Sequence, residues 1–514
     1  MKLKPSLLLS VILFCLAGAV RVEATTYTVK AGGGGNYITV QACANVVAAG
    51  DICQIYPGTY NEVVNVRASG TSGNPVTFIN SGTALVTGFI ITAHNYITIQ
   101  GLSLGNHSAA GTPGVYLSGA SHVTITQCNI NYTGKQAVRF SATSPSDHTV
   151  ISNNVISWTG YNDSGDYAID IYGDYNLVDS NDISHAADYT HVHGSFNVVR
   201  NNTFHDSSST DFGQPSGSIH IDGMQTWAST TAPLHHLLME HNAMWNTPET
   251  NVHFALLQDQ TPTSDNPSDA ITRYNVYYGC GSYFTMSDGI PNSRVYNNTI
   301  ANVTGPPQYI SSWTTEGGIG STGGVWLNNI LYNSVISGWS DIAYDRGSGP
   351  VRNGYSLVYN SGYSGTWQSS LTTEPGAILN HDPLFVNPSN DFALQSGSPA
   401  IGAGGALTKV ASVDTGSGTS LAVNDAGVFQ DGYTGVINAD WIRIGTANTV
   451  QIAAINYSTN MITLATGVSR SPGDPVYLYK DSNGGIVLFG SAPDIGAFRY
   501  VTVAPPTNLT AYPH

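Results

Sequence analysis

The sequence predicts an all-β protein built as a parallel β-helix, a solenoid in which short strands stack rung upon rung. The first observation is composition: only 10% of the 514 residues are charged, while Gly numbers 56 and Tyr 29. Such a mixture favours short strands and tight turns over helices. The second observation is a unit of strand, Asn and apolar pair that recurs from about residue 95. A recurring unit of this kind is typical of a repeat architecture.

The repeat gives each unit one residue at an equivalent position. Successive units lie 21 to 40 residues apart, so the longer ones are expected to carry loops of variable length. An Asn amide has one acceptor and two donors, and stacked Asn side chains inside a coil can bond one another and the turn backbone. A run of exposed turn residues is the alternative. The aligned residues are Cys128, Asn154, Asn181, Asn202, Asn242, Asn275, Asn298 and Asn329.

The first 24 residues predict an export signal. Lys2 and Lys4 precede an apolar run over residues 7–20, and small residues around Ala24 offer a cleavage site before Thr25. We therefore expect a secreted protein, extracellular or periplasmic. We expect no membrane span, because no apolar run is long enough to cross a bilayer.

Net charge and cysteine content limit the kinds of partner that the protein is expected to bind and the cellular compartment in which it is expected to fold. The net charge of −16 argues against a nucleic-acid partner, because phosphate binding needs a basic surface. Cys43 and Cys53 lie close together and are expected to form a disulfide in an oxidising compartment, with two buried thiols as the alternative. A long capped coil is expected to be a monomer.

The two ends of the chain carry further patterns. The segment TVQACANVVAAGDICQIYPGTYNE holds an expected amphipathic helix at 40–49, followed by a strand and a Pro-Gly turn. The strings GSPAIGAG (397–404) and APDIGAFRY (492–500) lie near the other end. Together with the repeat, these segments resemble the pectate-lyase-like superfamily of right-handed parallel β-helices. The resemblance implies a right-handed coil whose open N-terminal end is covered by the helix.

The resemblance also divides the chain. The resemblance covers a right-handed parallel β-helix at 25–405 and a closing strand at 491–500. Beside it the residues themselves predict a signal at 1–24, a small β subdomain inserted at 406–490, where hairpin-like alternations recur, and a Pro-rich, linker-like tail at 501–514. The resemblance implies a polysaccharide as partner and leaves the activity open, because the superfamily holds lyases, hydrolases, epimerases and non-catalytic adhesins.

A second strand of each rung carries the polar residues of most interest. Apolar residues alternate with others, which predicts that the apolar set faces the core and its neighbours face solvent. Column neighbours on a parallel sheet lie about 5 Å apart. The first predicted column is Tyr116, Arg139, Asp170, His191, His220 and His253, and the second is Ser118, Ser141, Tyr172, His193, Asp222 and Ala255. The gathering of imidazoles and carboxylates predicts a functional site, with a solvated polar face as the alternative.

This chemistry predicts cleavage of a polysaccharide by β-elimination. A carboxylate beside a His orients the ring and suits it to general acid or base work. His191 or His220 would be the base, Arg139 or Lys135 would neutralise a uronate carboxylate, and Tyr172 or Tyr189 would protonate the leaving oxygen. The predicted catalytic residues are His191, His220, Asp170, Asp222 and Tyr172, and the predicted substrate-binding residues are Arg139, Lys135, His193, His253, Tyr189, Gln225 and Trp227.

Two other classes stay open. A glycoside hydrolase needs two suitably spaced carboxylates, and the predicted columns put Asp170 and Asp222 about 12 Å apart, too far for either usual geometry. Asp163 or Asp166 would then have to partner Asp170. A non-catalytic sugar-binding protein would use exposed aromatics such as Trp227. No cofactor is certain, tight zinc binding is disfavoured because outward side chains on a flat sheet diverge, and Ca²⁺ would help an acidic protein to hold an anionic sugar.

Overall fold

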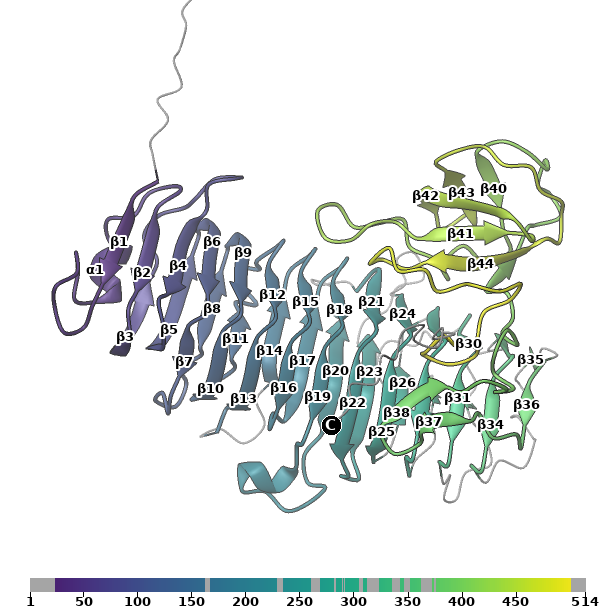
Figure 1. Ribbon diagram of the computed structural model, residues 1–514, viewed down its shortest axis with the longest axis horizontal. Coiled ribbons are helices and arrows are strands. Elements are labelled where there is room, and N and C mark those ends of the chain that lie inside the picture. The colour runs from purple at the N-terminus through teal and green to yellow at the C-terminus, as the bar shows by residue number, and fades with distance from the viewer. Residues whose placement is uncertain are drawn as a thin grey trace, which may run out of the picture.

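The computed structural model is a parallel β-helix with a smaller antiparallel unit packed beside its C-terminal half (Figure 1). The structure describes residues 24–161, 167–228, 234–259, 269–281, 283–288, 290, 292–304, 308–311, 323–334, 343–345, 352–361, 372–373 and 376–500. The predicted export signal, apart from its last residue, and the predicted tail lie outside this range. Within it, no helix is long and apolar enough to cross a membrane.

The first sheet of the coil has 14 parallel strands, one from each rung. Its strands are β1 (Thr26–Val29), β2 (Ile52–Ile55), β4 (Val76–Asn80), β6 (Asn95–Gln100), β9 (Ser121–Thr126), β12 (Val150–Ser152), β15 (Leu177–Asp179), β18 (Val198–Arg200), β21 (Leu237–Glu240), β24 (Ala270–Arg273), β27 (Ser293–Tyr296), β30 (Val325–Leu327), β33 (Arg352–Gly354) and β35 (Thr372–Thr373).

The remaining parallel strands form two rows, here called the second and third sheets. Both rows begin from the long strands β3 (Gly58–Asn65) and β5 (Ala84–Thr92), because β5 pairs with β7 and with β8. The second sheet is β7 (Ser103–Gly105), β10 (Asn129–Thr133), β13 (Val155–Thr159), β16 (Asp182–Ser184), β19 (Thr203–His205), β22 (Ala243–Thr247), β25 (Val276–Cys280), β28 (Thr299–Ala301), β31 (Ile330–Tyr332), β34 (Leu357–Tyr359) and β36 (Ile378–Leu379). The third sheet is β8 (Val115–Ser118), β11 (Val138–Phe140), β14 (Tyr167–Tyr172), β17 (Asp188–His193), β20 (Ile221–Ala228), β23 (Val252–Asp259), β26 (Tyr283–Asp288), β29 (Gln308–Ser311) and β32 (Ala343–Asp345).

The predicted Asn ladder is present and holds the corner between the first and second sheets. Each Asn Oδ1 accepts from the backbone N–H and the side-chain amide of the Asn one rung earlier, as Asn202 does from Asn181 at 2.9 and 3.0 Å. The same pair of bonds links Asn202 to Asn242. The ladder runs from Asn154 to Asn329, and Cys128 stands at its first step. Buried amides are satisfied along the coil axis, so the rungs are held in register.

The N-terminal helix is shorter than the sequence predicts. α1 spans Val40–Ala44, a single turn, where a helix over 40–49 was expected. Thr39 caps its start, but the N–H groups of Val46 and Val47 both bond to the carbonyl of Cys43, so the chain turns away after one turn. A capping helix of the expected length is therefore not supported. The Cys43–Cys53 disulfide is formed, as predicted.

The C-terminal segments cover two of the three sheets. A six-stranded antiparallel sheet of β39 (Thr408–Lys409), β40 (Ser420–Ala422), β41 (Trp441–Ile444), β42 (Asn448–Asn456), β43 (Met461–Leu464) and β44 (Pro475–Lys480) packs its core on the outer face of the first sheet. The hairpin β37 (Phe385–Asn387) and β38 (Asp391–Leu394) packs on the second sheet. The expected closing strand at 491–500 is not a strand; these residues form bends.

A buried ion network joins the antiparallel unit to the coil. Arg273 of β24 is fully buried and donates to both carboxylate oxygens of Asp440 at 2.8 Å. Its Nε also donates to Glu240 at 2.8 Å. Because a buried charge is costly unless it is paired, these contacts fix how the unit docks. The third sheet, which carries the polar columns, is left to form the candidate site.

Candidate functional site

The central strands of the third sheet, from β14 to β26, bend at one residue in each rung, and the bend decides which side chains face outward. Pairing between β14 and β17 passes from Tyr167 with Asp188 to Ile169 with Thr190, so it skips one residue on each strand. The skipped Tyr189 is fully buried in the main core. Two successive side chains therefore face away from the outer surface. Beyond the bend, the alternation of core-facing and outward-facing residues is shifted by one position.

The register between β17 and β20 differs from the predicted one. His191 pairs with Gln225 rather than with His220. The same register puts Asp188 beside Asp222, whose backbone N–H donates to Asp188 Oδ1 at 2.8 Å. The predicted columns aligned His220 with His191 and Asp222 with His193, which is five positions too far along the strand. The pairings of Arg139 with Asp170, Asp170 with His191 and Tyr172 with His193 are confirmed.

One set of residues, here called the β17 group, consists of Arg139, Asp170, Tyr172, His191 and His193. The Nδ1–H of His191 donates to Asp170 Oδ1 at 3.0 Å, and both side chains are almost fully buried. The ring of His193 stacks on Tyr172 at 4.2 Å between centroids and meets the ring of His191 edge-on at 4.3 Å. The carboxylate and the flanking rings therefore hold the His191 imidazole in one orientation.

Two further features of the β17 group bear on its chemistry. The Nε2 atom of His191 makes no hydrogen bond within the described part of the chain. Burial, followed by the nearby Asp170 carboxylate, raises the pKa of the Tyr172 phenol to about 12, against a smaller lowering by Arg139. Tyr172 is thus a neutral hydrogen-bond donor at physiological pH, and its ring lies edge-on to His191 at 6.4 Å.

A second set, here called the β20 group, consists of His220, Asp222 and His253. Asp222 lies near the start of β20 and pairs in register with His253 of β23. His253 Nδ1–H donates to Asp222 Oδ1 at 2.7 Å, and His220 Nδ1 lies 3.5 Å from Asp222 Oδ2. Asp222 is fully buried, His253 nearly so, and the side chain of His220 is 48% exposed. One buried carboxylate therefore contacts two imidazoles.

The carboxylates of the two central rungs differ in charge. Burial would raise the pKa of Asp222, but the imidazoles of His253 and His220 outweigh this and the pKa is lowered. Burial and the neighbouring Asp222 raise the pKa of Asp188 well above its ordinary value. Asp188 was missed by the sequence analysis. It stands three residues before His191, as Asp222 stands three residues before Gln225, and this shared spacing was the available signal.

The two groups are separate along the strands. In the observed register, His220 lies seven positions from the level of His193 and Tyr172. At about 3.3 Å per residue this is up to about 23 Å. His220 and Tyr172 therefore cannot act on one bond, and the predicted single constellation is corrected to two.

The other predicted residues have varied places. Tyr189 lies in the core, where its hydroxyl meets Thr247 Oγ1 at 3.2 Å, so it cannot contact a substrate as predicted. Lys135 is half-buried before β11, and Gln225 is buried beside His191. Trp227 belongs to β20, but its side chain lies outside the described residues, as do Asp163 and Asp166.

The loop before β20 is anchored by a buried carboxylate. Glu249 Oε1 accepts from Ser208 Oγ at 2.7 Å and from the Ser209 backbone at 3.0 Å, next to the short 3₁₀ helix η1 (Ser209–Phe212). Glu249 Oε2 accepts from Ser216 Oγ at 2.9 Å and from the Gly217 backbone. Four bonds to one carboxylate fix the segment that delivers His220 to the sheet.

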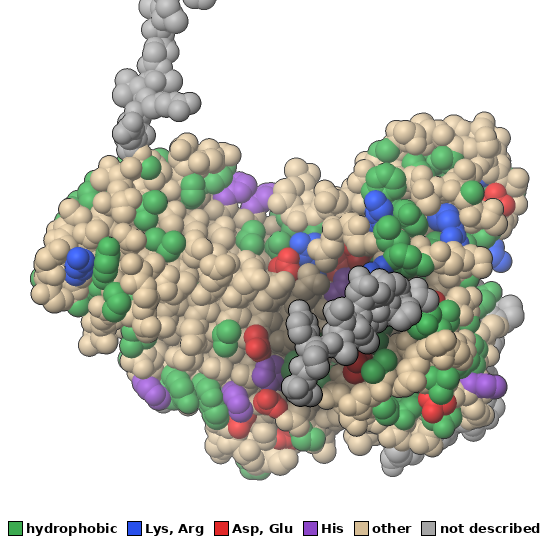
Figure 2. Space-filling model, in the orientation of Figure 1, with side chains coloured by type: hydrophobic (Ala, Val, Ile, Leu, Met, Phe, Trp, Pro, Cys, Tyr) green, Lys and Arg blue, Asp and Glu red, His purple; other side chains and the backbone are tan. Residues whose placement is uncertain are grey.

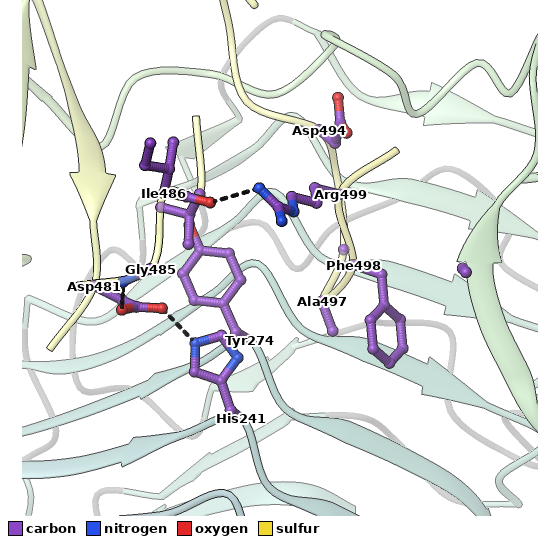
Figure 3. Close-up of a pocket in the computed structure, with 12 residues that line it drawn as sticks. His241, Tyr274, Asp481, Gly485, Ile486, Asp494, Ala497, Phe498 and Arg499 are labelled. Carbon is purple, nitrogen blue, oxygen red and sulfur yellow. Dashed lines mark hydrogen bonds and ion pairs between the residues drawn. The ribbon is translucent and has the colours of Figure 1, made fainter. Parts of the chain in front are cut away.

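Figure 2 shows acidic and His side chains over the middle of the coil, while Lys and Arg gather towards the antiparallel unit. A cavity of about 420 Å³ lies at the junction of that unit with the first sheet (Figure 3). There His241 Nε2 lies 2.8 Å from Asp481 Oδ2, and Arg499 donates to the Ile486 carbonyl at 3.2 Å. This cavity contains none of the predicted site residues.

Either group offers ligand atoms for a metal. Asp170, His191 and His193 form one set, and His220, Asp222 and His253 form another, each with its three candidate ligand atoms within 4.8 Å of one another. Two nitrogens and one carboxylate suit zinc or a related transition metal, whereas Ca²⁺ takes six to eight oxygen ligands. The Ca²⁺ expected from the acidic charge is not what these sets favour.

Comparison with known proteins identifies the fold class of the chain. The family described as the right handed beta helix region matches residues 87–225, and the stacked sheets agree with it. The chain therefore contains a right-handed parallel β-helix, as its resemblance to the pectate-lyase-like superfamily implied. A comparison with curated proteins found no match.

Solved structures of the same architecture resemble the chain at low identity. The A-module of mannuronan C-5 epimerase AlgE6 from Azotobacter vinelandii is 13% identical, with 67% of this chain and 94% of that one covered, at a TM-score of 0.46. Pectate lyase Pel9A is 13% identical, with 93% and 97% covered, at 0.43. An alginate lyase from Paenibacillus sp. str. FPU-7 is 17% identical, with 52% and 92% covered, at 0.39. At these values the likeness carries no argument about the reaction.

Proposed function

We propose that this chain is a carbohydrate-active enzyme that cleaves a uronate polysaccharide by β-elimination at the β17 group. The observation that carries the proposal is the row formed by Arg139, Asp170 and His191 on adjacent strands, with Tyr172 at its side. β-Elimination needs a cation for the uronate carboxylate, a base for the C5 proton and an acid for the leaving oxygen. The row supplies one group for each need.

Arg139 is the cation. Its guanidinium can bind a carboxylate through two parallel hydrogen bonds, and this neutralisation makes the adjacent C5–H more acidic. It stands next to Asp170 in the sheet and close enough to Tyr172 to lower the pKa of that phenol. A uronate held by Arg139 would therefore lie against Tyr172.

His191 is the base. Its Nδ1–H is held by Asp170 at 3.0 Å, which leaves the lone pair on Nε2, the atom without a hydrogen bond among the described residues. Nε2 takes the C5 proton, the electron pair forms the C4=C5 double bond, and the C4–O bond breaks. The leaving oxygen takes the proton of Tyr172, and water then returns a proton to Tyr172 and removes one from His191.

The test measures unsaturated product and reducing ends on a panel of polysaccharides. We expect uronate polymers to give ultraviolet absorbance from the new conjugated double bond. Because a positioned acid contributes about 10²–10⁴-fold, Tyr172→Phe should lower kcat by that factor with little change in KM. His185→Ala is the matched control, since His185 also pairs with a carboxylate, Asp211 at 3.0 Å, but lies outside the group. Absence of unsaturated product on every uronate would overturn the proposal.

Hydrolysis is the second candidate, and one observation favours it. Asp188 and Asp222 are neighbours on adjacent strands, and the strand spacing of about 4.8 Å is compatible with the carboxyl separation of about 5–5.5 Å in retaining glycosidases. Both side chains are buried, as are those of Asp170 and His191. Reducing ends without unsaturation would select hydrolysis over β-elimination. Binding with neither product would select the non-catalytic alternative.

A further inference from the structure

We infer that the β20 group, His220, Asp222 and His253, is a binding site for a divalent transition metal such as Zn²⁺. The site is distinct from the β17 group and does not depend on the proposed elimination. It rests on the distances, the burial and the bonding of three side chains from β23 and the start of β20.

The distances suit a single ion. The Asp222 carboxylate stands between the Nδ1 atoms of two imidazoles, at 2.7 Å from His253 and 3.5 Å from His220. Two ligands bound to one zinc at about 2.0–2.2 Å, at a tetrahedral angle, lie about 3.3 Å apart. Small rotations of the rings would therefore bring all three ligand atoms onto one ion. Asp222 and His253 are in-register neighbours on adjacent strands, and His220 precedes Asp222 by two residues.

Burial supplies an independent observation. Asp222 is fully buried, and its Oδ2 makes no hydrogen bond within the described residues. A buried carboxylate oxygen without a bond is costly, and an ion bound there would satisfy it. The divalent ion would replace the ring proton that His253 donates to the carboxylate in the metal-free protein and would bridge the 3.5 Å gap between Asp222 Oδ2 and His220 Nδ1.

The surroundings define the kind of site. The His253 ring is fixed by stacking on Tyr283 at 5.3 Å and 6°. His220 is half exposed, so a water or a ligand could complete the coordination from the open side. Zinc sites with three protein ligands and an open position are of the catalytic type. The nitrogen-rich set excludes Mg²⁺ and Ca²⁺ as preferred ions.

The alternative set is less suited to a cation. Asp170, His191 and His193 have the same composition, but Arg139 stands next to Asp170 in register. Its positive charge would oppose an ion there. The β20 group instead has the carboxyl of Asp188 beside Asp222.

The test titrates Zn²⁺ into chelator-treated, full-length protein by calorimetry, with Co²⁺ absorbance as a second probe of the ligand set. We expect one Zn²⁺ per chain and a higher Tm. His220→Ala, at a half-exposed position, should weaken binding at least tenfold, and Asp222→Asn should do the same if it folds. His205→Ala is the control, because His205 contacts two carboxylates, Asp182 and Asp206, but no second imidazole.

Two results would overturn the inference: no Zn²⁺ binding by the wild-type protein, or equal Zn²⁺ affinity in His220→Ala and the wild type. Either result would leave the elimination assay with Tyr172→Phe unaffected. Failure of the metal site and failure of the proposed reaction are therefore separate outcomes.

Discussion

Replacing Asn202 with Ala tests whether the Asn ladder holds the coil together. The buried Asn202 side chain takes part in four hydrogen bonds. Its Oδ1 accepts from the backbone N–H and the amide of Asn181 at 2.9 and 3.0 Å. Its Nδ2 donates to the Val178 carbonyl and to Asn242 Oδ1, both at 3.0 Å. Alanine removes all four and leaves the Asn181 backbone N–H without its partner.

The cost follows from these bonds. Each contributes about 1 kcal/mol net, and a buried N–H left unpaired costs about 1–3 kcal/mol more. Some of the loss is offset, because the Asn181 amide keeps its bond to the Ile151 carbonyl. We therefore expect the free energy of unfolding to fall by about 3–6 kcal/mol in Asn202→Ala.

Urea denaturation followed by circular dichroism measures this change. Because stacked repeats can unfold in stages, the transition that includes the central rungs is the one to compare, at constant m value. The control is Asn129→Ala: Asn129 is exposed and accepts one bond, from Asn131 at 3.3 Å. Its substitution should cost less than about 0.5 kcal/mol. An equal loss in the two variants would refute the view that the ladder stabilises the coil.

Two further predictions concern the contact between the coil and the antiparallel unit. Arg273→Met leaves the buried carboxylates of Glu240 and Asp440 without their cation, so the free energy of unfolding should fall by about 3–5 kcal/mol; an unchanged Tm would contradict this. Burial lowers the pKa of His236, but the Asp269 carboxylate outweighs it and the net pKa is raised. The stabilisation by this pair is therefore complete below about pH 6.5 and is lost as pH rises through the raised folded-state pKa. The Tm difference between the wild type and His236→Gln should shrink from pH 6 to pH 9, and a constant difference would show that the pair does not titrate as inferred.

The fold could be predicted because its signals are local and repeat. An inward Asn recurs once a rung whatever the loop length, so the ladder from Asn154 to Asn329 was found from sequence alone. The pairing of Asp170 with His191 was also found, because few residues separate their strands. The predicted helix over 40–49 failed because the amphipathic pattern continues past the point where the backbone turns.

The site was predicted only in part because alternation is a rule for straight strands. A bend reverses which residues face the core on its far side, which puts Tyr189 in the core and leaves Asp188 buried beside Asp222. The long loop before β20 also hid where this strand begins, so that His220 lies five positions from the level of His191. No local sequence pattern predicts a bend of this kind. The available sign was a repeated spacing of three residues, from Asp188 to His191 and from Asp222 to Gln225.

The bend also explains how the third sheet keeps several ionisable groups buried. A buried carboxylate stays charged where a cation or imidazole compensates it, and otherwise takes up a proton. Asp222 is compensated by two imidazoles and its pKa is lowered, whereas burial and the neighbouring Asp222 raise the pKa of Asp188. Negative charge on these rungs is therefore confined to places where imidazole stands beside it. Since the bend separates Asp222 from His191, each group balances its own charge, and removing His220 should leave the Asp170–His191 pair unaltered.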